Sequence, residues 1–449
     1  MIYNNQRDLD IMQTILISIK SIIQLLNSPL GISFMSIFSC LCFYFYNHER
    51  KTIKTLIRIV YFSIFTFIAY IFFSTLKYRL SSFQIWDFTS FYLWAKVAVQ
   101  SYNFYLPENS QIVFNTLSLP AGNFQEFIEG IVKVGFLYPP PTMFYFYLLG
   151  YLNFDSALIV WTLFIILFLF VCIYIIYKED FRNYKINGLV LVTILALIDS
   201  TVKSTIFCSQ TNFMVLLYLL LMKRYSSNKW SGVLLALAFF TKPFMLIFGL
   251  YFLLSKNWKP IAYFIASVIL LSGISILTFG SDTFMSYFFN NTAQRIPAWQ
   301  FSEDINQSLH AVLLRANLIS LDKPHFYLII SAILVGITIL FSRYLLKKKL
   351  EDHVWALLLL VGLLVYPGTL SYYGVVLLFI VFQFFNKEKT LGLDYRICIP
   401  VVGILFYLSS VSVFSSICFL LIIVISKSLW QINQLNSSII TNLRSSNVK

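Results

Sequence analysis

SSFQIWDFTSFYLWAKVAVQSYNFY, residues 81–105, follows an apolar run that ends near Phe73 and is itself too polar to cross a membrane. One isolated acid, Asp87, stands in it among tryptophan, phenylalanine and tyrosine residues. Because amphipathic aromatic rings favour the headgroup level of a bilayer, we expect the acid at that level. We interpret the stretch as the active-site loop of a membrane enzyme. The alternative is a surface amphipathic helix with one solvated carboxylate.

The composition is that of a polytopic membrane protein. Of the 449 residues, 59% are hydrophobic and only 12% are charged, whereas about a quarter of a soluble domain is charged. The net charge of +14 does not indicate a nucleic-acid partner, because Lys and Arg fall mostly in the short loops that set membrane orientation. The six cysteines lie mostly in or beside apolar runs without a CxxC pair, which favours neither a disulfide framework nor a metal site.

Hydropathy divides the chain into three parts. Residues 1–30 form an N-terminal segment, in which residues 11–27 are either an interfacial helix or a poor first span. Residues 31–427 form a single all-α membrane domain with about 12 to 14 apolar segments, several of them shorter than the ~20 residues of a full span. Residues 428–449 form a polar tail, which we expect to be cytoplasmic and partly disordered.

Basic connectors orient these segments. The connectors around Lys51, Lys223 and Lys256 are rich in Lys and Arg, which predicts that they are cytoplasmic. Two long polar loops, at about 78–137 and 281–324, are then external. The first is expected to hold helical pieces around Asp87 and at 124–134. Counting spans leaves one conflict, so either segment 141–152 or segment 186–200 must be re-entrant or half-spanning.

Five polar groups lie in or next to the apolar segments, where polar groups are costly and are functional candidates by default. They are Asp87; Tyr138-Pro139-Pro140; Ser209-Gln210-Thr211-Asn212; Thr241-Lys242-Pro243; and Asn306-Gln307-Ser308-Leu309 with His310 and Arg315.

The order of these groups, with GVLLALAFFTKPFMLIFGLYFLLSKNW around Lys242, resembles glycosyltransferase family 87 over about residues 55–385. The resemblance implies the membrane-embedded C-type glycosyltransferase fold and an activity like that of polyprenyl-phosphate-mannose-dependent mannosyltransferases. Two departures, Ser209 where glycine is common and Tyr372-Tyr373 where a histidine is common, concern the sugar and the acceptor more than the fold.

The resemblance implies an inverting hexosyltransferase that uses a polyprenyl-phosphate-linked sugar, with mannose the sugar it suggests. The acceptor is expected to be a lipid or a glycan on the outer face of the plasma membrane, which is the inner membrane of a bacterial cell. No cofactor is implied. The rival interpretations are a lipid or polysaccharide transporter or flippase, which would place ionisable residues near the midplane of several spans, and an assembly scaffold.

The resemblance implies that Asp87 is the catalytic base. The chemistry agrees, because inversion requires one carboxylate to take the proton of the attacking hydroxyl. A departing lipid phosphate needs a cation, and the candidates are Lys242 and Arg315, with Arg295 behind them. The alternative for Lys242 is a lysine that anchors the end of a span by reaching toward the interface.

The candidate substrate-binding residues are Tyr138, Gln210, Asn212, Asn306, Gln307 and His310. Asn306 and His310 lie four residues apart, hence on one face if the segment is helical. Gln210 and Asn212 are equally typical of hydrogen bonds between packed helices, and His310 of a satisfied interfacial histidine. Glu303-Asp304 is interpreted as a solvated pair, and no metal site is predicted.

Overall fold

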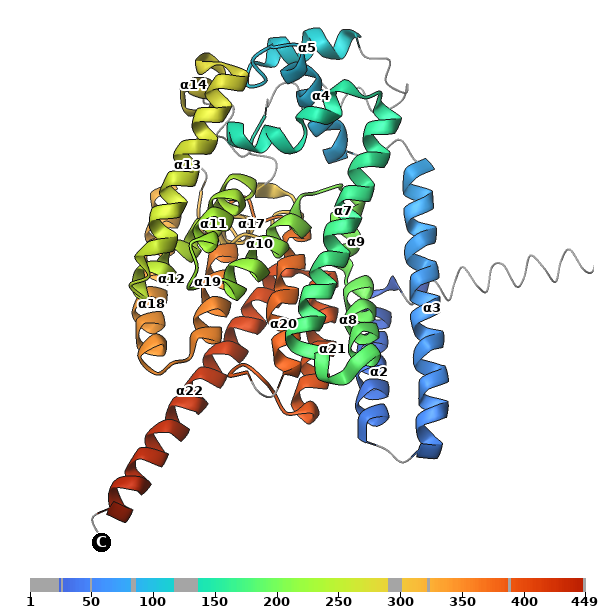
Figure 1. Ribbon diagram of the computed structural model, residues 1–449, viewed down its shortest axis with the longest axis vertical. Coiled ribbons are helices and arrows are strands. Elements are labelled where there is room, and N and C mark those ends of the chain that lie inside the picture. The colour runs from blue at the N-terminus through green and yellow to red at the C-terminus, as the bar shows by residue number, and fades with distance from the viewer. Residues whose placement is uncertain are drawn as a thin grey trace, which may run out of the picture.

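The computed structural model describes residues 24–25, 27–48, 51–81, 86–116, 136–289, 301–320, 324–386 and 389–446 (Figure 1). This part of the chain is helical, as the composition and hydropathy predicted. Its β pairing is confined to one isolated antiparallel bridge between Asn306 and Leu370. The helix expected at 124–134, Arg295, and most of segment 11–27 lie outside the described residues.

A layer of short helices forms the upper end of the molecule in Figure 1. It contains α4 (Trp86–Val99), α5 (Pro107–Thr116), η1 (Pro140–Tyr145), η2 (Tyr147–Tyr151) and α14 (Ser281–Phe289). Gly150 of η2 lies directly on α4, since a Cβ added there would be 2.5 Å from the carbonyl oxygen of Ala95. Segment 141–152 therefore packs in this layer against α4 and does not run along the bundle.

A helical bundle lies below this layer. Its first half contains α2 (Pro29–His48), α3 (Lys51–Ser81), α7 (Phe154–Ile176), η3 (Tyr177–Phe181), η4 (Arg182–Tyr184), α8 (Lys185–Ile198), α9 (Ser200–Phe207), α10 (Asn212–Arg224) and α11 (Trp230–Thr241). Its second half contains η5 (Pro243–Phe248), α12 (Gly249–Leu254), α13 (Trp258–Phe279), α17 (Leu309–Arg315), α18 (Pro324–Lys347), α19 (Glu351–Val365), η6 (Ser371–Leu377), α20 (Leu378–Phe385), α21 (Tyr395–Val411) and α22 (Val413–Ser446).

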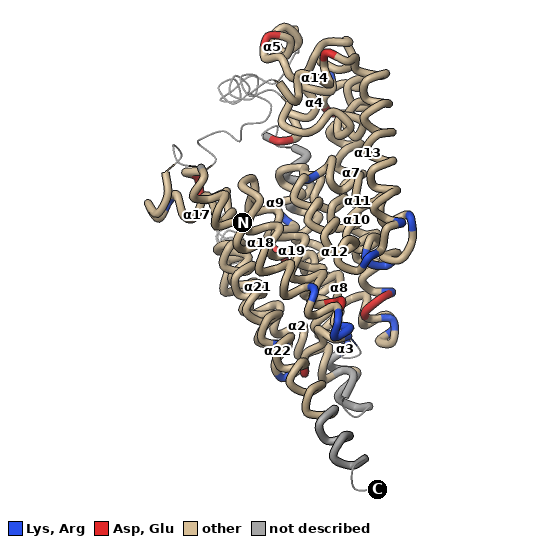
Figure 2. Tube along the Cα trace, turned by 90° about the vertical axis from the view of Figure 1, so that its left-hand side faces the viewer, with Lys and Arg blue, Asp and Glu red and all other residues tan. Residues whose placement is uncertain are grey.

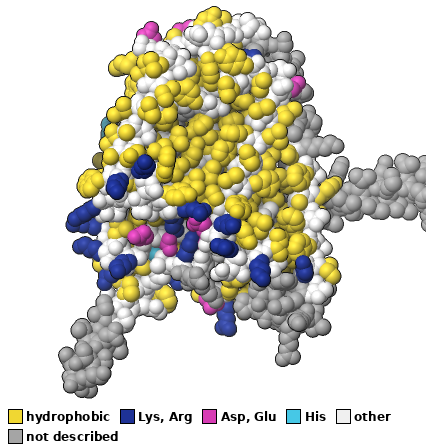
Figure 3. All heavy atoms as spheres, viewed as in Figure 1, with side chains coloured by type: hydrophobic (Ala, Val, Ile, Leu, Met, Phe, Trp, Pro, Cys, Tyr) yellow, Lys and Arg dark blue, Asp and Glu magenta, His cyan; other side chains and the backbone are white. Residues whose placement is uncertain are grey.

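Four helical stretches of the described chain are long and apolar enough to cross a membrane. They are Phe154–Ile198, Trp258–Phe279, His325–Lys347 and Val413–Ser438, and six shorter apolar stretches within the described residues have 10–17 residues. The first stretch contains both α7 and α8, between which the chain reverses direction (Figure 1). Apolar side chains cover most of the face in Figure 3, above a zone rich in Lys and Arg. In Figure 2 the coloured Lys and Arg positions lie mainly below α4, α5 and α14, in the middle and lower parts of the molecule.

Bundle helices break inside the molecule at polar residues and prolines. Lys242, which follows α11, has an extended backbone (φ −147°, ψ 108°) because the next residue is Pro243, and proline disfavours a helical conformation in the residue before it. Pro367 lies in the break between α19 and η6, which begins at Ser371. Interrupted helices at membrane depth are tolerated where they pack in protein or line a wet cavity.

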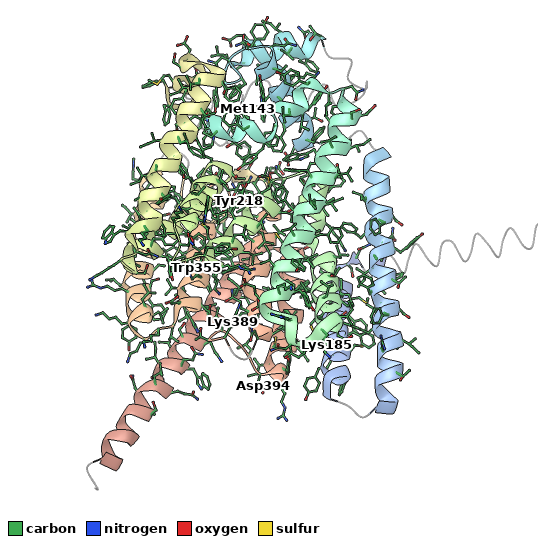
Figure 4. All side chains as sticks on the ribbon, in the orientation of Figure 1. Met143, Lys185, Tyr218, Trp355, Lys389 and Asp394 are labelled. Carbon is green, nitrogen blue, oxygen red and sulfur yellow. The ribbon has the colours of Figure 1, made fainter. Side chains whose placement is uncertain are left out.

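Ion pairs hold the lower end together. Lys223 of α10 pairs with Asp352 of α19 at 2.6 Å, and Lys389 pairs with Asp180 of η3 at 2.5 Å. Figure 4 places Lys389 below Trp355, a buried side chain of the bundle interior. Together the pairs join α10, α19, η3 and the loop after α20, and they lie far below the upper layer.

Helix α22 corrects one expectation. Residues 428–446 were expected to belong to a partly disordered tail, but they continue the helix that begins at Val413. The first of them packs in the bundle, because the hydroxyl of Ser428 lies 2.7 Å from Nδ1 of the buried His353 on α19. The hydrogen bonds of the helix then continue through the polar residues, which extend below the bundle in Figure 1.

Candidate active site

Lys242 is the centre of a polar cluster between the upper layer and the bundle. Its side chain is buried, with 1% of the residue exposed. The Nζ atom donates to the hydroxyls of Tyr138 at 3.0 Å and Tyr373 at 2.8 Å, and to Oε1 of Gln210 at 3.4 Å. It also lies 4.9 Å from the ring centroid of Tyr138 and 4.3 Å from that of Tyr373. The break before Pro243 therefore places an ammonium group between two tyrosines.

Gln210 joins this ammonium to the predicted base. Its Nε2 donates to Oδ2 of Asp87 at 2.7 Å, while its Oε1 accepts from Lys242. The two charges fix the orientation of the amide, since the oxygen must face the cation and the nitrogen the carboxylate. The loop before α10 is held by a left-handed Ser209 (φ 54°) and by Trp161, whose Nε1 donates to the Ser209 carbonyl at 2.8 Å.

Asp87 lies in the first turn of α4, where the helix dipole favours a negative charge. The residue is half-buried, and the next five residues of the helix are all buried. The packing of α4 therefore fixes the backbone that carries the carboxylate, and Gln210 orients its oxygen atoms. A half-buried carboxylate with a set position can act as a general base.

Lys242 has no direct ion pair among the described residues. Its hydrogen-bond partners are two neutral hydroxyls and one amide, and the nearest acid of the cluster, Asp87, lies on the other side of that amide. Asp87 still interacts electrostatically with Lys242 across that amide, so Lys242 is a buried cation whose nearest carboxylate is held one side chain away.

Tyr138 is positioned from both sides. Its carbonyl accepts from the hydroxyl of Tyr105 at 2.6 Å, and its ring lies 5.9 Å from that of Phe91 on α4. The residues that follow dock on the end of α11, since Thr142 Oγ1 donates to the Phe240 carbonyl at 2.6 Å. The prolines after Tyr138 thus turn the chain from the upper layer onto the helix that ends at Lys242.

Asn212 lies near the cluster and packs helices together. Its Nδ2 donates to the carbonyl of Tyr372 at 3.0 Å and to Oγ1 of Thr205 at 3.3 Å. These bonds hold η6 against α9 and α10, so they position the neighbouring Tyr373. Tyr373 was not among the candidate site residues. The sequence does carry a signal for it, because Tyr372-Tyr373 follows closely after the helix break at Pro367. A tyrosine at such a break has its hydroxyl near the breaks of other helices.

The second polar segment, residues 305–307 with Arg315, forms a set of contacts separate from the Lys242 cluster. Asn306 Nδ2 donates to the Pro367 carbonyl at 2.9 Å, and the backbone of residues 305–307 pairs with residues 369–371. Gln307 Oε1 accepts from Ser412 Oγ at 2.8 Å. Arg315 donates through Nη1 to the carbonyls of residues 301, 303 and 306. These three side chains hold the loop and the start of η6, and none has a hydrogen bond to Lys242 or Asp87 among the described contacts.

His310 lies between aromatic rings. Its ring centroid is 4.3 Å from that of Tyr327 and 4.6 Å from that of Phe301, and neither ring nitrogen has a partner among the described residues. Burial lowers the pKa of His310, which favours the neutral ring. The side chain of Asp304 is fully exposed, and its carboxylate lies 3.6 Å from Nε of Arg315. The described residues contain no group of three or more His, Cys, Asp and Glu side chains that could hold a metal ion.

Comparison with known proteins identifies one family. The family model described as Glycosyltransferase family 87 matches residues 136–370, more than half of the chain. No curated protein and no solved structure matches. The matched residues contain Tyr138, Gln210 and Lys242, and they end before Tyr373. Asp87 precedes them, and the Gln210 amide joins it to this region.

Proposed function

Since the chain belongs to glycosyltransferase family 87, we propose that this glycosyltransferase takes a hexose from a polyprenyl phosphate and transfers it with inversion to a lipid or glycan acceptor. The observation that carries the proposal is the row formed by Asp87, Gln210 and Lys242, which supplies a base and a buried cation separated by one amide. The family match favours transfer over transport, and its resemblance to mannosyltransferases suggests mannose as the hexose.

The proposed reaction uses each charge once. The Asp87 carboxylate takes the proton of the acceptor hydroxyl as the oxygen attacks the anomeric carbon. The bond between that carbon and the phosphate oxygen breaks, and the electron pair leaves with the polyprenyl phosphate. Because attack and departure occur on opposite faces of the sugar, the base and the cation must flank it. The negative charge that grows on the phosphate then meets the Lys242 ammonium.

Lys242 is our candidate for the phosphate-binding cation in preference to Arg315. The lysine has neutral partners and is buried at the cluster, whereas the Nη1 group of Arg315 donates to three carbonyls of its own loop. Tyr138 and Tyr373 are neutral side chains. Their hydroxyls hold the ammonium in place and provide polar groups for phosphate oxygens or sugar hydroxyls. We propose that Asn306, Gln307 and His310 act indirectly, because they belong to the loop that packs against the start of η6.

The proposed location follows from the distribution of charge. Lys and Arg gather toward the end of the molecule opposite α4 and α5 (Figure 3), and basic loops remain in the cytoplasm. We therefore place the upper layer, and the acceptor, outside the plasma membrane. Cysteine substitution tests this: Asn115→Cys on α5 should react with a membrane-impermeant reagent added to sealed cells, and Ser227→Cys should not. The reverse pattern contradicts the orientation.

The proposed activity is tested by transfer from a defined donor. Purified protein in lipid nanodiscs should release polyprenyl phosphate from radiolabelled polyprenyl-phosphate-mannose and place the label on membrane lipid or added glycan. The anomeric configuration of the product, read by NMR, should be opposite to that of the donor. Transfer only from a nucleotide sugar, or a product with retained configuration, would contradict the proposed donor or mechanism.

A further inference from the structure

A polar cavity lies between α9, the start of η6 and the junction of α21 with α22. It has a volume of about 290 Å³ and is lined by residues from four parts of the chain: α9, residues 304–307, the start of η6, and the junction of α21 with α22. The lining contains six serines, together with Thr201, Gln307 and Asp304. At about 30 Å³ per water molecule, the cavity has room for about ten waters, the order of size of one sugar ring.

The lining favours a neutral ligand rich in hydroxyl groups. Neither Lys nor Arg is among the described residues that line the cavity, and its single charged side chain, Asp304, is exposed. Serine hydroxyls can both donate and accept. Those of Ser409 and Ser410 donate to helix carbonyls and keep their acceptor lone pairs. The nearby Arg315 is already paired with Asp304, with its Nε atom 3.6 Å from the carboxylate, and a hydrocarbon chain would strip water from polar groups without replacing their hydrogen bonds.

The cavity is joined to the cluster by short runs of chain. Ser371 in its lining precedes Tyr373 by two residues. Ser204 precedes Thr205, whose carbonyl accepts from the backbone N–H of Gln210 at 3.0 Å and whose hydroxyl donates to the Tyr372 carbonyl. The same α9 and η6 that position Gln210 and Tyr373 thus form one wall of the cavity.

We propose that this cavity binds a sugar unit of the acceptor, next to the unit whose hydroxyl attacks the donor. The proposal rests on the proposed function, since it assigns a carbohydrate acceptor to the same enzyme. A glycan whose end lies at Asp87 would extend along η6 and place its next ring among the serines. Contacts at this second ring would raise affinity for longer acceptors without touching the reacting atoms.

The test compares short acceptors. Methyl glycosides of mannose, glucose and galactose, and of their homodisaccharides, are offered with polyprenyl-phosphate-mannose. For at least one sugar, the wild type should show a KM about tenfold lower for the disaccharide than for the monosaccharide. Ser410→Trp, which fills the cavity, should remove that difference while leaving kcat for the monosaccharide and donor affinity unchanged. Ser204→Ala should reduce it in part, and Ser437→Trp, on the exposed end of α22, should keep it.

The outcomes separate this proposal from the proposed function. Equal KM values for monosaccharides and disaccharides in the wild type would overturn the proposal that the cavity binds a sugar unit. A preference for disaccharides that survives Ser410→Trp would also overturn it. Absence of transfer to every acceptor would count against the proposed function instead. Saturation-transfer NMR with the same disaccharides then tests whether they bind in the cavity, independently of catalysis. Signals that Ser410→Trp abolishes support it, and a lack of signals with the wild type overturns it.

Discussion

Replacing Asp87 with asparagine tests the proposed base with little change in shape. Gln210 Nε2 donates to Oδ2 of the aspartate at 2.7 Å, and the side-chain oxygen of an asparagine can accept the same bond. The change therefore removes a charge and a proton acceptor and keeps the contact. Lys242 has no direct hydrogen bond to Asp87, so binding of the donor phosphate should persist.

The expected loss of transfer rate is much larger than the expected change in stability. A positioned general base contributes about 10²- to 10⁴-fold to rate, which at about 1.4 kcal/mol per factor of ten is about 3 to 6 kcal/mol of transition-state stabilisation. Exchanging a charged acceptor for a neutral one weakens a hydrogen bond by about 1 kcal/mol. Transfer should consequently fall by at least a hundredfold while thermal stability changes little.

The assay is the initial rate of transfer from radiolabelled polyprenyl-phosphate-mannose with equal amounts of folded variant. Donor affinity is measured separately by equilibrium binding. Glu108→Gln is the matched control, because Glu108 is an exposed acid in the first turn of the neighbouring helix α5 and should retain full activity. Near-normal transfer by Asp87→Asn would refute the assignment of the base. A parallel loss of donor binding would show that the carboxylate acts through Lys242 instead.

Three further predictions concern the cation, its tyrosine partner and the lower end. Lys242→Met keeps the length of the side chain and removes its charge, so donor affinity should fall by about 2 kcal/mol, or about 30-fold; unchanged affinity would leave this lysine as a structural anchor. Tyr373→Phe removes one hydroxyl that accepts from Lys242 at 2.8 Å and should weaken donor binding by about 1 kcal/mol, measured in the same assay; no change would show that the hydroxyl does not position the ammonium. Lys223→Met leaves Asp352 without its 2.6 Å partner and should lower the melting temperature in detergent by several degrees with donor affinity unchanged; an unaltered melting temperature would contradict a stabilising role.

Individual site residues were predictable where the sequence marks a local conflict. Lys242 interrupts an apolar run directly before Pro243, so the helix break and an unusual lysine could be predicted from neighbouring residues alone. Gln210 also stands out, because it is a polar residue between two apolar runs. Whether each side chain reaches a substrate site or holds helices together could not be predicted, because both roles place polar groups in apolar segments. In the structure, Gln210 lies in the cluster and Asn212 packs η6 against α9.

The sequence by itself determined the helical membrane class, because hydropathy is a property that adds up along the chain and needs no knowledge of distant contacts. It also located the basic loops and the polar residues that make up most of the cluster. Only the tertiary structure decided that segment 141–152 stays in the upper layer and that Arg315 is held by its own loop. It alone brought Tyr373 to Lys242. Tyr373 and Lys242 are 131 residues apart in the sequence, and the carbonyls that hold Arg315 are 9 to 14 residues away from it; only the folding of the chain sets which of these groups meet.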